Sequence, residues 1–376
     1  MGRRLVLVTG GAGFIGSHLV DLLVEKGCDV RVYDNLDPQV HPRRKAPGYL
    51  DPRASLVRGD VRDQKKLLWA LEGVDVVVHL AAAVGMGQSM YQVERYVSAN
   101  TGGTAVLLDL LVNGNLPVKK LVVASSMSIY GEGKYQCQNC GPVYPGLRSE
   151  AQLGKRDWEL DCPSCGRKAV PIPTDETKPL QPTAVYSMTK RHQEELCLLI
   201  GKTYGIPTVA LRFFNVYGPR QTLSNPYTGV SAIFTSQILS GKPPYIFEDG
   251  GQRRDFVHVR DVANAVWMSL EKRAADFQVY NVGSGSSISI RELAEYLLRI
   301  HGSSLPPFVS NAFRVGDTRH CFADITKIRG DLGYAPTVDL EKGFAELAEW
   351  SRSQVGVQDR SGEAKKELER HGLVLG

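Results

Sequence analysis

Apolar and polar positions alternate along the first 125 residues in a pattern that predicts strands and helices in turn. Short apolar runs with the length of buried strands occupy residues 5–8, 30–33, 56–58, 74–80 and 121–124. The segments between them that are typical of helices are 14–26, 63–72 and 91–113. Residues 36–54 are rich in proline, arginine and aspartate and are expected to form a loop. The alternation predicts an α/β fold whose doubly wound parallel sheet is covered by helices on both faces.

The pattern breaks after Gly131, where residues 134–170 are rich in cysteine, glycine, proline and charge. Beyond this insertion we expect a helix over 185–203, a strand over 208–213, and helices near 229–240, 261–272, 289–301 and 340–352. Ser289 and Glu292 have the spacing of a capping box. The tail from residue 353 is polar and is expected to be loosely ordered.

These elements divide the chain into two domains, an insertion and a tail. The first domain should comprise residues 1–133 and 171–222, with contributions from 208–215 and from parts near 255–285. Residues 134–170 form the insertion, residues 223–352 mainly a smaller mixed α/β domain, and residues 353–376 the polar tail.

Composition narrows the partners that the chain can have. It has 376 residues, 43% of them hydrophobic and 23% charged, which is typical of a globular protein of about two domains. The net charge of +5 is mild and the basic residues are scattered, so we expect no nucleic-acid partner. No apolar run has the length of a membrane span, and the first one leads directly into a glycine-rich turn. We therefore expect a cytoplasmic protein without a membrane partner.

Residues 9–16, Thr-Gly-Gly-Ala-Gly-Phe-Ile-Gly, follow the first strand and open the first helix. Glycines at such a turn let backbone N–H groups approach a pyrophosphate, and the helix N-terminus adds partial positive charge. Asp34 ends the second strand, 18 residues after Gly16. Its carboxylate can accept hydrogen bonds from both ribose hydroxyls and would repel a 2′-phosphate, so NAD is favoured over NADP. The alternative for Asp34 is a turn aspartate beside Asn35.

Tyr186 and Lys190 lie four residues apart and therefore on one face of the predicted helix. A nearby ammonium favours the phenolate, so we expect Lys190 to lower the pKa of Tyr186 toward neutrality. Such a tyrosine could take the proton of a sugar hydroxyl while hydride leaves the same carbon. Ser126 follows a buried strand, at the sheet edge where ligands bind in α/β folds, and could hold the reacting oxygen. The alternative is a serine-rich strand end that caps backbone groups.

With these motifs in order, residues 3–350 resemble the extended short-chain dehydrogenase/reductases, in the nucleotide-sugar epimerase/dehydratase branch. The resemblance rests on residues 9–16, 33–35, 60–61, 80–82, 125–131, 186–190, 211–220, 254–259 and 280–283. It implies a Rossmann fold, bound NAD, a nucleotide-diphosphate sugar as substrate, and a homodimer formed through the helices near 93–113 and 186–203.

The resemblance also implies roles for individual residues. Ser126, Tyr186 and Lys190 match the catalytic set. The NAD-binding positions would be Gly10, Gly13, Phe14, Ile15, Gly16, Asp34, Asn35, Asp60, Val61, Leu80, Ala81, Ala82, Asn100, Tyr186, Lys190 and Phe214. The substrate contacts would be Gly87, Gln88, Ser126, Asn215, Arg254, Arg314 and Asp317.

Two positions after the catalytic serine bear on the reaction. Dehydratases and decarboxylases of this branch carry a carboxylate there, whereas this chain has Met127 and Ser128. The resemblance thus implies an NAD-dependent 4-epimerase, an isomerase that forms a transient 4-keto sugar. Residues 81–90, 126–130 and the insertion are most similar to dTDP-L-rhamnose 4-epimerases, which make dTDP-6-deoxy-L-talose. The alternatives are a UDP-glucose 4-epimerase, a reductase or dehydratase of the same fold, and a non-catalytic NAD-binding scaffold.

Four of the seven cysteines form two CxxC motifs separated by 21 residues: Cys137, Cys140, Cys162 and Cys165. This spacing is typical of a zinc ribbon, and a glycine after each motif permits the tight turn. Four thiolates would leave zinc no open coordination position, so the metal would be structural. The alternative is four reduced or disulfide-paired cysteines. Because the insertion separates Ser126 from Tyr186, we expect it to form a wall or lid over the sugar pocket or to contact a second subunit.

Overall fold

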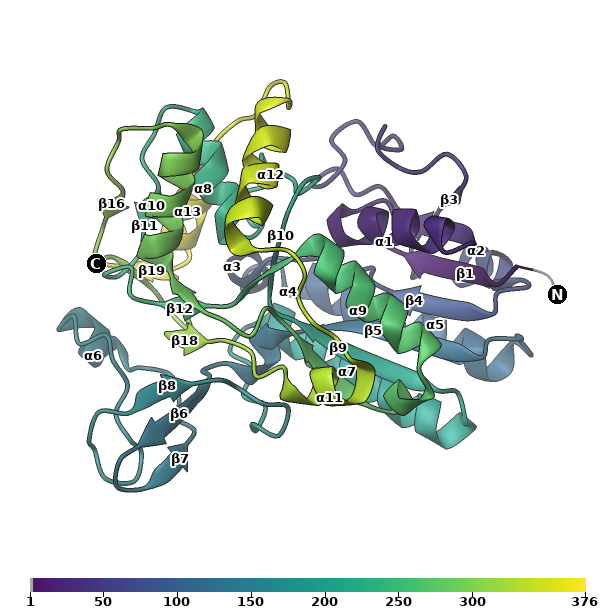
Figure 1. Cartoon of the computed structure of the whole chain (residues 1–376), viewed down its shortest axis with the longest axis horizontal. Coiled ribbons are helices and arrows are strands. Elements are labelled where there is room, and N and C mark those ends of the chain that lie inside the picture. The colour runs from purple at the N-terminus through teal and green to yellow at the C-terminus, as the bar shows by residue number, and fades with distance from the viewer. Residues whose placement is uncertain (1–2) are drawn as a thin grey trace.

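The computed structural model describes residues 3–376 and is built around a parallel sheet of seven strands (Figure 1). In spatial order the strands are β14 (Val279–Val282), β9 (Thr208–Phe213), β5 (Lys120–Ser126), β4 (Val76–His79), β1 (Leu5–Thr9), β2 (Asp29–Asp34) and β3 (Ser55–Arg58). The strand order reverses between β1 and β4, so the sheet is doubly wound, as the sequence predicts.

Helices cover both faces of this sheet, because its strands carry apolar side chains on both sides. Val6 and Val8 face a core that includes α1 (Phe14–Glu25) and α9 (Val259–Glu271). Leu7 faces the opposite core with α2 (Gln64–Leu71), α5 (Gly103–Asn113) and α7 (Val185–Tyr204). The period of two along a strand places alternate residues in the two cores.

The helix expected over 91–113 is composite. It contains α4 (Val93–Tyr96), a π-helical stretch η1 (Val97–Gly102) and α5. Asn100 lies in the π-helical stretch, a feature that often accompanies functional sites.

The smaller domain packs three helices around Phe344: α8 (Val230–Leu239), α10 (Ile290–His301) and α12 (Leu340–Arg352). The predicted capping box of Ser289 and Glu292 is present at the start of α10. The short strands of the smaller domain are β11 (Tyr245–Ile246), β12 (Arg253–Arg254), β15 (Ile288–Ser289), β16 (Phe308–Val309), β17 (Phe313–Arg314) and β18 (His320–Cys321). Outside the insertion and the C-terminal segment, the other short elements of the chain are α3 (Met86–Ser89), η2 (Met127–Tyr130), β10 (Asn215–Tyr217), β13 (Phe256–His258), η3 (Arg273–Ala275) and α11 (Thr326–Leu332).

The insertion is a small antiparallel sheet with one short helix. Its strands are β6 (Lys134–Cys137), β7 (Gly141–Val143) and β8 (Val170–Ile172), and its helix is α6 (Glu150–Gly154). In Figure 1 it lies below β12 and β18 of the smaller domain.

The expectation of a loosely ordered tail is wrong. Residues after 353 form α13 (Ser361–Arg370) and β19 (Val374–Leu375), which pairs antiparallel with β17. The segment is held by a narrow apolar stripe, in which Leu368 and Val374 pack on Ala312. Within α13 only Ala364 and Leu368 are buried, which is too few to give a clear periodic pattern.

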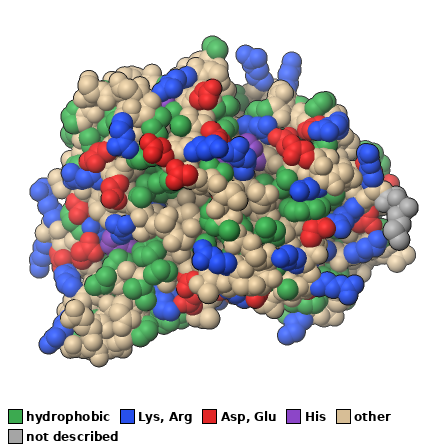
Figure 2. Space-filling model, in the orientation of Figure 1, with side chains coloured by type: hydrophobic (Ala, Val, Ile, Leu, Met, Phe, Trp, Pro, Cys, Tyr) green, Lys and Arg blue, Asp and Glu red, His purple; other side chains and the backbone are tan. Residues whose placement is uncertain are grey.

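On the face drawn in Figure 2, basic and acidic side chains are interspersed, and no one kind of side chain dominates the surface. Among residues 3–376, no helix combines the length and the apolar character needed to cross a bilayer.

Candidate functional site

A cleft of about 450 Å³ opens at the carboxyl ends of the central strands and extends to the smaller domain. Every residue predicted to bind NAD lines it except Asn100, and so does the predicted catalytic set. Of the predicted substrate contacts beyond Ser126, only Asn215 lines this cleft. The structure therefore gathers the predicted NAD-binding and catalytic residues in one cleft and leaves most of the predicted substrate contacts outside it.

The glycine-rich turn is packed so tightly that side chains would not fit. Gly10 has φ +69°, and a Cβ there would lie 2.9 Å from the backbone nitrogen of Ala81. A Cβ on Gly16 would lie 2.3 Å from the carbonyl oxygen of Gly10. The N-cap of α1, Gly13, caps the helix with no side chain. Backbone N–H groups at this end of α1 thus face the cleft, which suits a pyrophosphate.

Asp34 lies at the end of β2 in the wall of the cleft. Its two carboxylate oxygens accept hydrogen bonds from the backbone N–H groups of Ala12 at 3.1 Å and Leu36 at 2.9 Å. Burial raises the pKa of Asp34, and these hydrogen bonds oppose that shift. The carboxylate is therefore fixed beside the glycine-rich turn, where the ribose of a dinucleotide would lie.

The loop at 36–54 contributes to the cleft in a way that sequence reasoning missed. Asp37, Gln39, Val40 and His41 line it, and the Nε2 atom of His41 is buried without a hydrogen-bond partner among the described residues. The proline-rich composition of this loop gave no sign that it folds back over the strand ends.

The predicted catalytic residues converge at one end of the cleft. The ammonium of Lys190 donates to the carbonyl of Ala124 at 2.6 Å and to Oε1 of Gln193 at 2.9 Å. Burial lowers the pKa of Lys190 to about 8. Ser126 hydrogen-bonds the Tyr186 hydroxyl, and its Oγ also accepts the backbone N–H of Ser128 at 3.1 Å.

The expectation for the pKa of Tyr186 is wrong for the chain alone. Burial raises it to about 12, and the hydrogen bond with Ser126 only partly opposes this shift. Desolvation penalises the phenolate, and the Lys190 ammonium donates to Ala124 and Gln193, not to Tyr186.

Asn100 lies beneath the cleft wall and supports it. Its amide group exchanges two hydrogen bonds with the backbone of Ala83, at 2.7 and 3.0 Å, and donates to Thr189 on α7. Asn100 therefore joins the strand end at residues 80–83 to the helix that carries Tyr186.

The other predicted substrate residues lie in two groups outside the cleft. Gln88 is buried, accepts a hydrogen bond from Tyr96 at 2.9 Å, and contacts Gln39 at 3.2 Å. A Cβ on neighbouring Gly87 would lie 2.7 Å from the side chain of Leu368 in α13.

The second group is charged. Asp317 pairs with Arg314 and lies 3.7 Å from Arg254, and both arginines help to lower its pKa against the opposing effect of burial. Arg254 directs its guanidinium to the carbonyls of Thr318 and Arg319. These three residues thus form one ion-paired group, in which Arg254 of β12 meets Arg314 of β17 and Asp317 of the segment that leads from β17 to β18.

The four cysteines of the insertion come together. Their Sγ atoms all lie within 4.8 Å of one another, and those of Cys137 and Cys165 are 3.6 Å apart. Backbone N–H groups of Ser164 and Cys165 hydrogen-bond the Cys162 thiol. Tetrahedral Zn–S bonds of about 2.3 Å place sulfur atoms about 3.8 Å apart, so this geometry suits zinc.

Comparison with known proteins agrees with this geometry. Residues 6–146 and 164–283 match the model of the NAD dependent epimerase/dehydratase family. The chain is 37% identical to a dTDP-L-rhamnose 4-epimerase of Burkholderia thailandensis, over 92% of this chain and 94% of the relative. It is 31% identical to a putative UDP-glucose 4-epimerase of Methanocaldococcus jannaschii, over 93% and 99%.

Among solved structures, a Thermus thermophilus UDP-glucose 4-epimerase in complex with NAD superposes with a TM-score of 0.73. The two chains are 30% identical, and the match covers 94% of this chain and all of the other. The chain therefore belongs to the NAD dependent epimerase/dehydratase family, and its epimerase relatives identify it as an isomerase of the nucleotide-sugar 4-epimerase type.

Proposed function

We propose that the enzyme inverts C4 of a nucleotide-diphosphate sugar and that dTDP-L-rhamnose is its substrate, giving dTDP-6-deoxy-L-talose. The observation that carries the reaction type is the convergence of Ser126, Tyr186 and Lys190 at one end of a cleft that also contains the glycine-rich turn and Asp34. Met127 and Ser128 supply no carboxylate next to Ser126, which favours epimerisation over elimination or decarboxylation. The Burkholderia relative supports the choice of sugar.

In this mechanism Tyr186 is the base. As the phenolate, beside Ser126, it takes the proton of the C4 hydroxyl and becomes the phenol, while Ser126 holds the same oxygen. The resulting 4-keto sugar turns over in the cleft, and Tyr186 returns the proton after the opposite face has been reduced. Lys190, held by Ala124 and Gln193, supplies positive charge beneath the reacting tyrosine.

NAD would occupy the cleft along the predicted positions that line it. Gly10, Gly13 and Gly16 would leave room for the pyrophosphate, and Asp34 would bind the adenosine ribose. When bound, NAD supplies the hydride acceptor and donor for C4, and its positive charge favours the Tyr186 phenolate. The cleft wall that Asn100 supports would then separate the reacting carbon from solvent.

We also propose that Cys137, Cys140, Cys162 and Cys165 hold a structural Zn²⁺. The sulfur spacing suits a tetrahedral site, and four protein ligands leave no open position for catalysis.

A homodimer is supported by an apolar surface on the helices where this family is expected to pair. Val93 and Val97 on the 93–102 segment are exposed, as are Met188 and Leu199 on α7. Exposed large apolar side chains on such helices are consistent with an interface between subunits.

Proton NMR of NAD-loaded protein tests the function and the substrate together. The protein is incubated with dTDP-L-rhamnose and, in a parallel tube, with UDP-glucose, the substrate named for the Methanocaldococcus and Thermus proteins. We expect a C4-inverted product from dTDP-L-rhamnose without net NADH. Inversion of UDP-glucose alone would contradict the choice of sugar, and no inversion in either tube would contradict a 4-epimerase acting on these sugars.

A further inference from the structure

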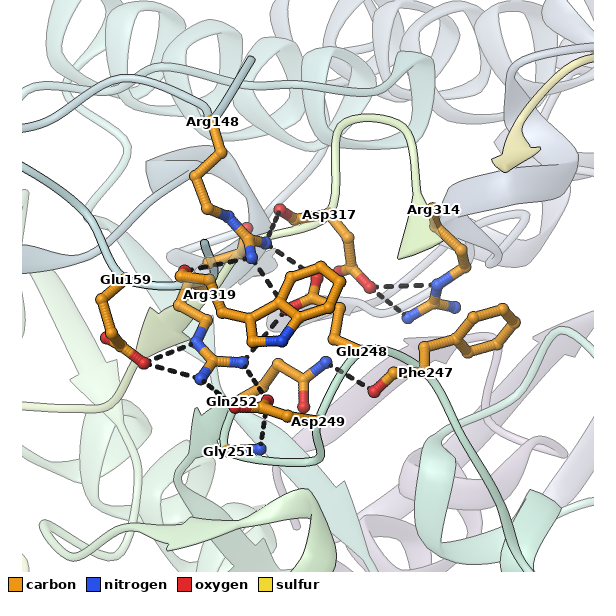
Figure 3. A network of polar contacts seen from close by, with 12 residues as sticks. Arg148, Glu159, Phe247, Glu248, Asp249, Gly251, Gln252, Arg314, Asp317 and Arg319 are labelled. Atoms are coloured by element: carbon orange, nitrogen blue, oxygen red, sulfur yellow. Dashed lines mark hydrogen bonds and ion pairs between the residues drawn. The ribbon is translucent and has the colours of Figure 1, made fainter. Parts of the chain in front are cut away.

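Arg148 belongs to the insertion but lies inside the smaller domain (Figure 3). Its guanidinium donates to the two carboxylate oxygens of Glu248 at 2.7 and 2.9 Å, and both side chains are only 1% exposed. The same guanidinium reaches the carbonyl of Trp158 at 3.3 Å and that of Asp317 at 3.2 Å. Arg148 therefore joins three segments that are far apart in the sequence.

One of these segments, residues 314–319, carries the predicted substrate contacts Arg314 and Asp317. We name it the substrate loop. Outside groups fix its backbone: Glu132 accepts the N–H groups of Arg319 and His320, each at 2.7 Å, and Arg254 donates to its last two carbonyls. Arg148 supplies the contact at the carbonyl of Asp317 itself. The position of the Asp317 carboxylate thus depends on a guanidinium that the insertion provides.

Glu248 connects its ion pair with Arg148 to the segment just before the substrate loop. Its φ is +55°, a conformation that non-glycine residues adopt at a cost and keep only where the surroundings fix it. Its N–H donates to the carbonyl of Ala312 at 2.8 Å, next to β17. Arg148 and Arg319 both bind its carboxylate, Arg319 at 3.1 Å, and so hold the strained residue in place.

The rest of the network shows that the insertion is bound to this loop and not merely adjacent to it. Glu159 of the insertion accepts hydrogen bonds from Arg319 at 2.6 and 3.0 Å and contacts Nε2 of His320 at 3.0 Å. Trp158 packs on Phe313 of β17. Arg148, Trp158 and Glu159 lie within residues 147–163, which the match to the family model leaves out.

We propose that Arg148 is a positioning residue for the substrate, through which the insertion holds Arg314 and Asp317 where the nucleoside diphosphate binds. The inference rests on the proposed function. Arg148 does not line the cleft that holds the catalytic set, so its loss should change KM and nucleotide affinity and leave kcat and NAD content nearly unchanged.

The test compares Arg148→Met and Arg148→Lys with Lys168→Ala. Lys168 forms exposed ion pairs with Asp157 and Asp161 in the same insertion, so its loss should change little. Calorimetry with dTDP and UDP on NAD-loaded enzyme measures affinity, and hydrogen exchange of residues 312–320 measures loop order. For Arg148→Met we expect affinity to fall about tenfold or more, with faster exchange in this segment.

Arg148→Lys should lose less nucleotide affinity than Arg148→Met and more than Lys168→Ala, because lysine keeps the charge but loses the planar fork. Wild-type affinity and exchange in Arg148→Met would overturn the inference while leaving the proposed function intact. Failure of the wild-type enzyme to bind either nucleotide would overturn both. If Arg148→Met does not fold, Arg148→Lys decides: a raised KM at constant kcat supports the inference, and an unchanged KM overturns it.

Discussion

The part of the site proposed to bind the dinucleotide and the part proposed to bind the substrate, here called the dinucleotide side and the substrate side, are built by different means. On the dinucleotide side, short contiguous motifs at strand ends and at the start of α7 place backbone groups and single side chains, such as Gly10, Asp34 and Tyr186, around the cleft. On the substrate side, the insertion, the Glu248 turn, the substrate loop and α13 hold one another through buried charges and apolar contacts. A change on the first side should therefore alter one function, whereas a change on the second should be transmitted to several elements.

The largest effect should come from the dinucleotide side, with Tyr186→Phe. Removing the hydroxyl removes the base, so we expect kcat to fall about 10²- to 10⁴-fold, measured by NMR of the sugar. Because the change is local, NAD content and melting temperature should be preserved. Tyr204→Phe, at an exposed position of the same helix, is the matched control. Near wild-type turnover in Tyr186→Phe would show that another group takes the proton.

Loss of the cysteine cluster should show how far a change on the substrate side spreads. In Cys162→Ser we expect zinc, measured by elemental analysis, to fall from about one per chain, because this cluster needs all four thiolates. The melting temperature should fall and KM should rise more than kcat changes. Ser164→Ala keeps all four thiols and serves as the control. Loss of zinc without any change in KM would separate the insertion from the substrate loop.

A smaller effect is expected where α13 packs against the substrate side. Leu368→Ala should lower the free energy of unfolding by about 2 kcal/mol, since it empties a buried site between Gly87 and Ala312. Urea unfolding measures the change, and fully exposed Val355→Ala is its control. We also expect nucleotide affinity to fall while NAD affinity stays constant. Equal losses of nucleotide affinity and NAD affinity would indicate that α13 supports the substrate side and the dinucleotide side alike.

The smallest effect concerns pH. Burial lowers the pKa of Lys190 to about 8 in the folded chain, below the ordinary lysine value of about 10.4 expected when unfolded. Between these values the unfolded chain binds more protons, so the Lys190 contribution to the free energy of unfolding should rise with pH. Between pH 8 and pH 10, the free energy of unfolding of the wild type should rise relative to that of Lys190→Met by on the order of 1 kcal/mol. A constant difference would show that Lys190 has an ordinary pKa.

How much of the molecule could be predicted from the sequence follows the same division. Six strands of the central sheet were predictable because they are short apolar runs, and its glycines mark the turn before α1; β14, whose sequence Val-Tyr-Asn-Val is interrupted by a polar residue, was not predicted. That most of the predicted NAD and catalytic residues line one cleft could be anticipated because they lie within short motifs, at strand ends or, for Tyr186 and Lys190, at the start of α7. The cysteine cluster was predictable from spacing alone.

The rest depends on pairs that no local pattern reveals. Arg148 and Glu248 are 100 residues apart, and Glu132 lies 187 residues from Arg319. Each is a charged residue that sequence patterning assigns to the surface, and burial is possible only because its partner arrives from another segment. The pKa of Tyr186 was mispredicted for a related reason: four-residue spacing reveals neither the burial that raises this pKa nor the donation of Lys190 to Ala124 and Gln193.

The most direct measurement follows the hydrogen on C4 of the sugar. Substrate carrying deuterium at C4 is incubated with NAD-loaded enzyme in ordinary water, and the product is analysed by NMR and mass spectrometry. If hydride leaves and returns on the same carbon while Tyr186 handles only the hydroxyl proton, the inverted product retains deuterium at C4 and no net NADH forms. Loss of deuterium to solvent, with inversion intact, would contradict this account.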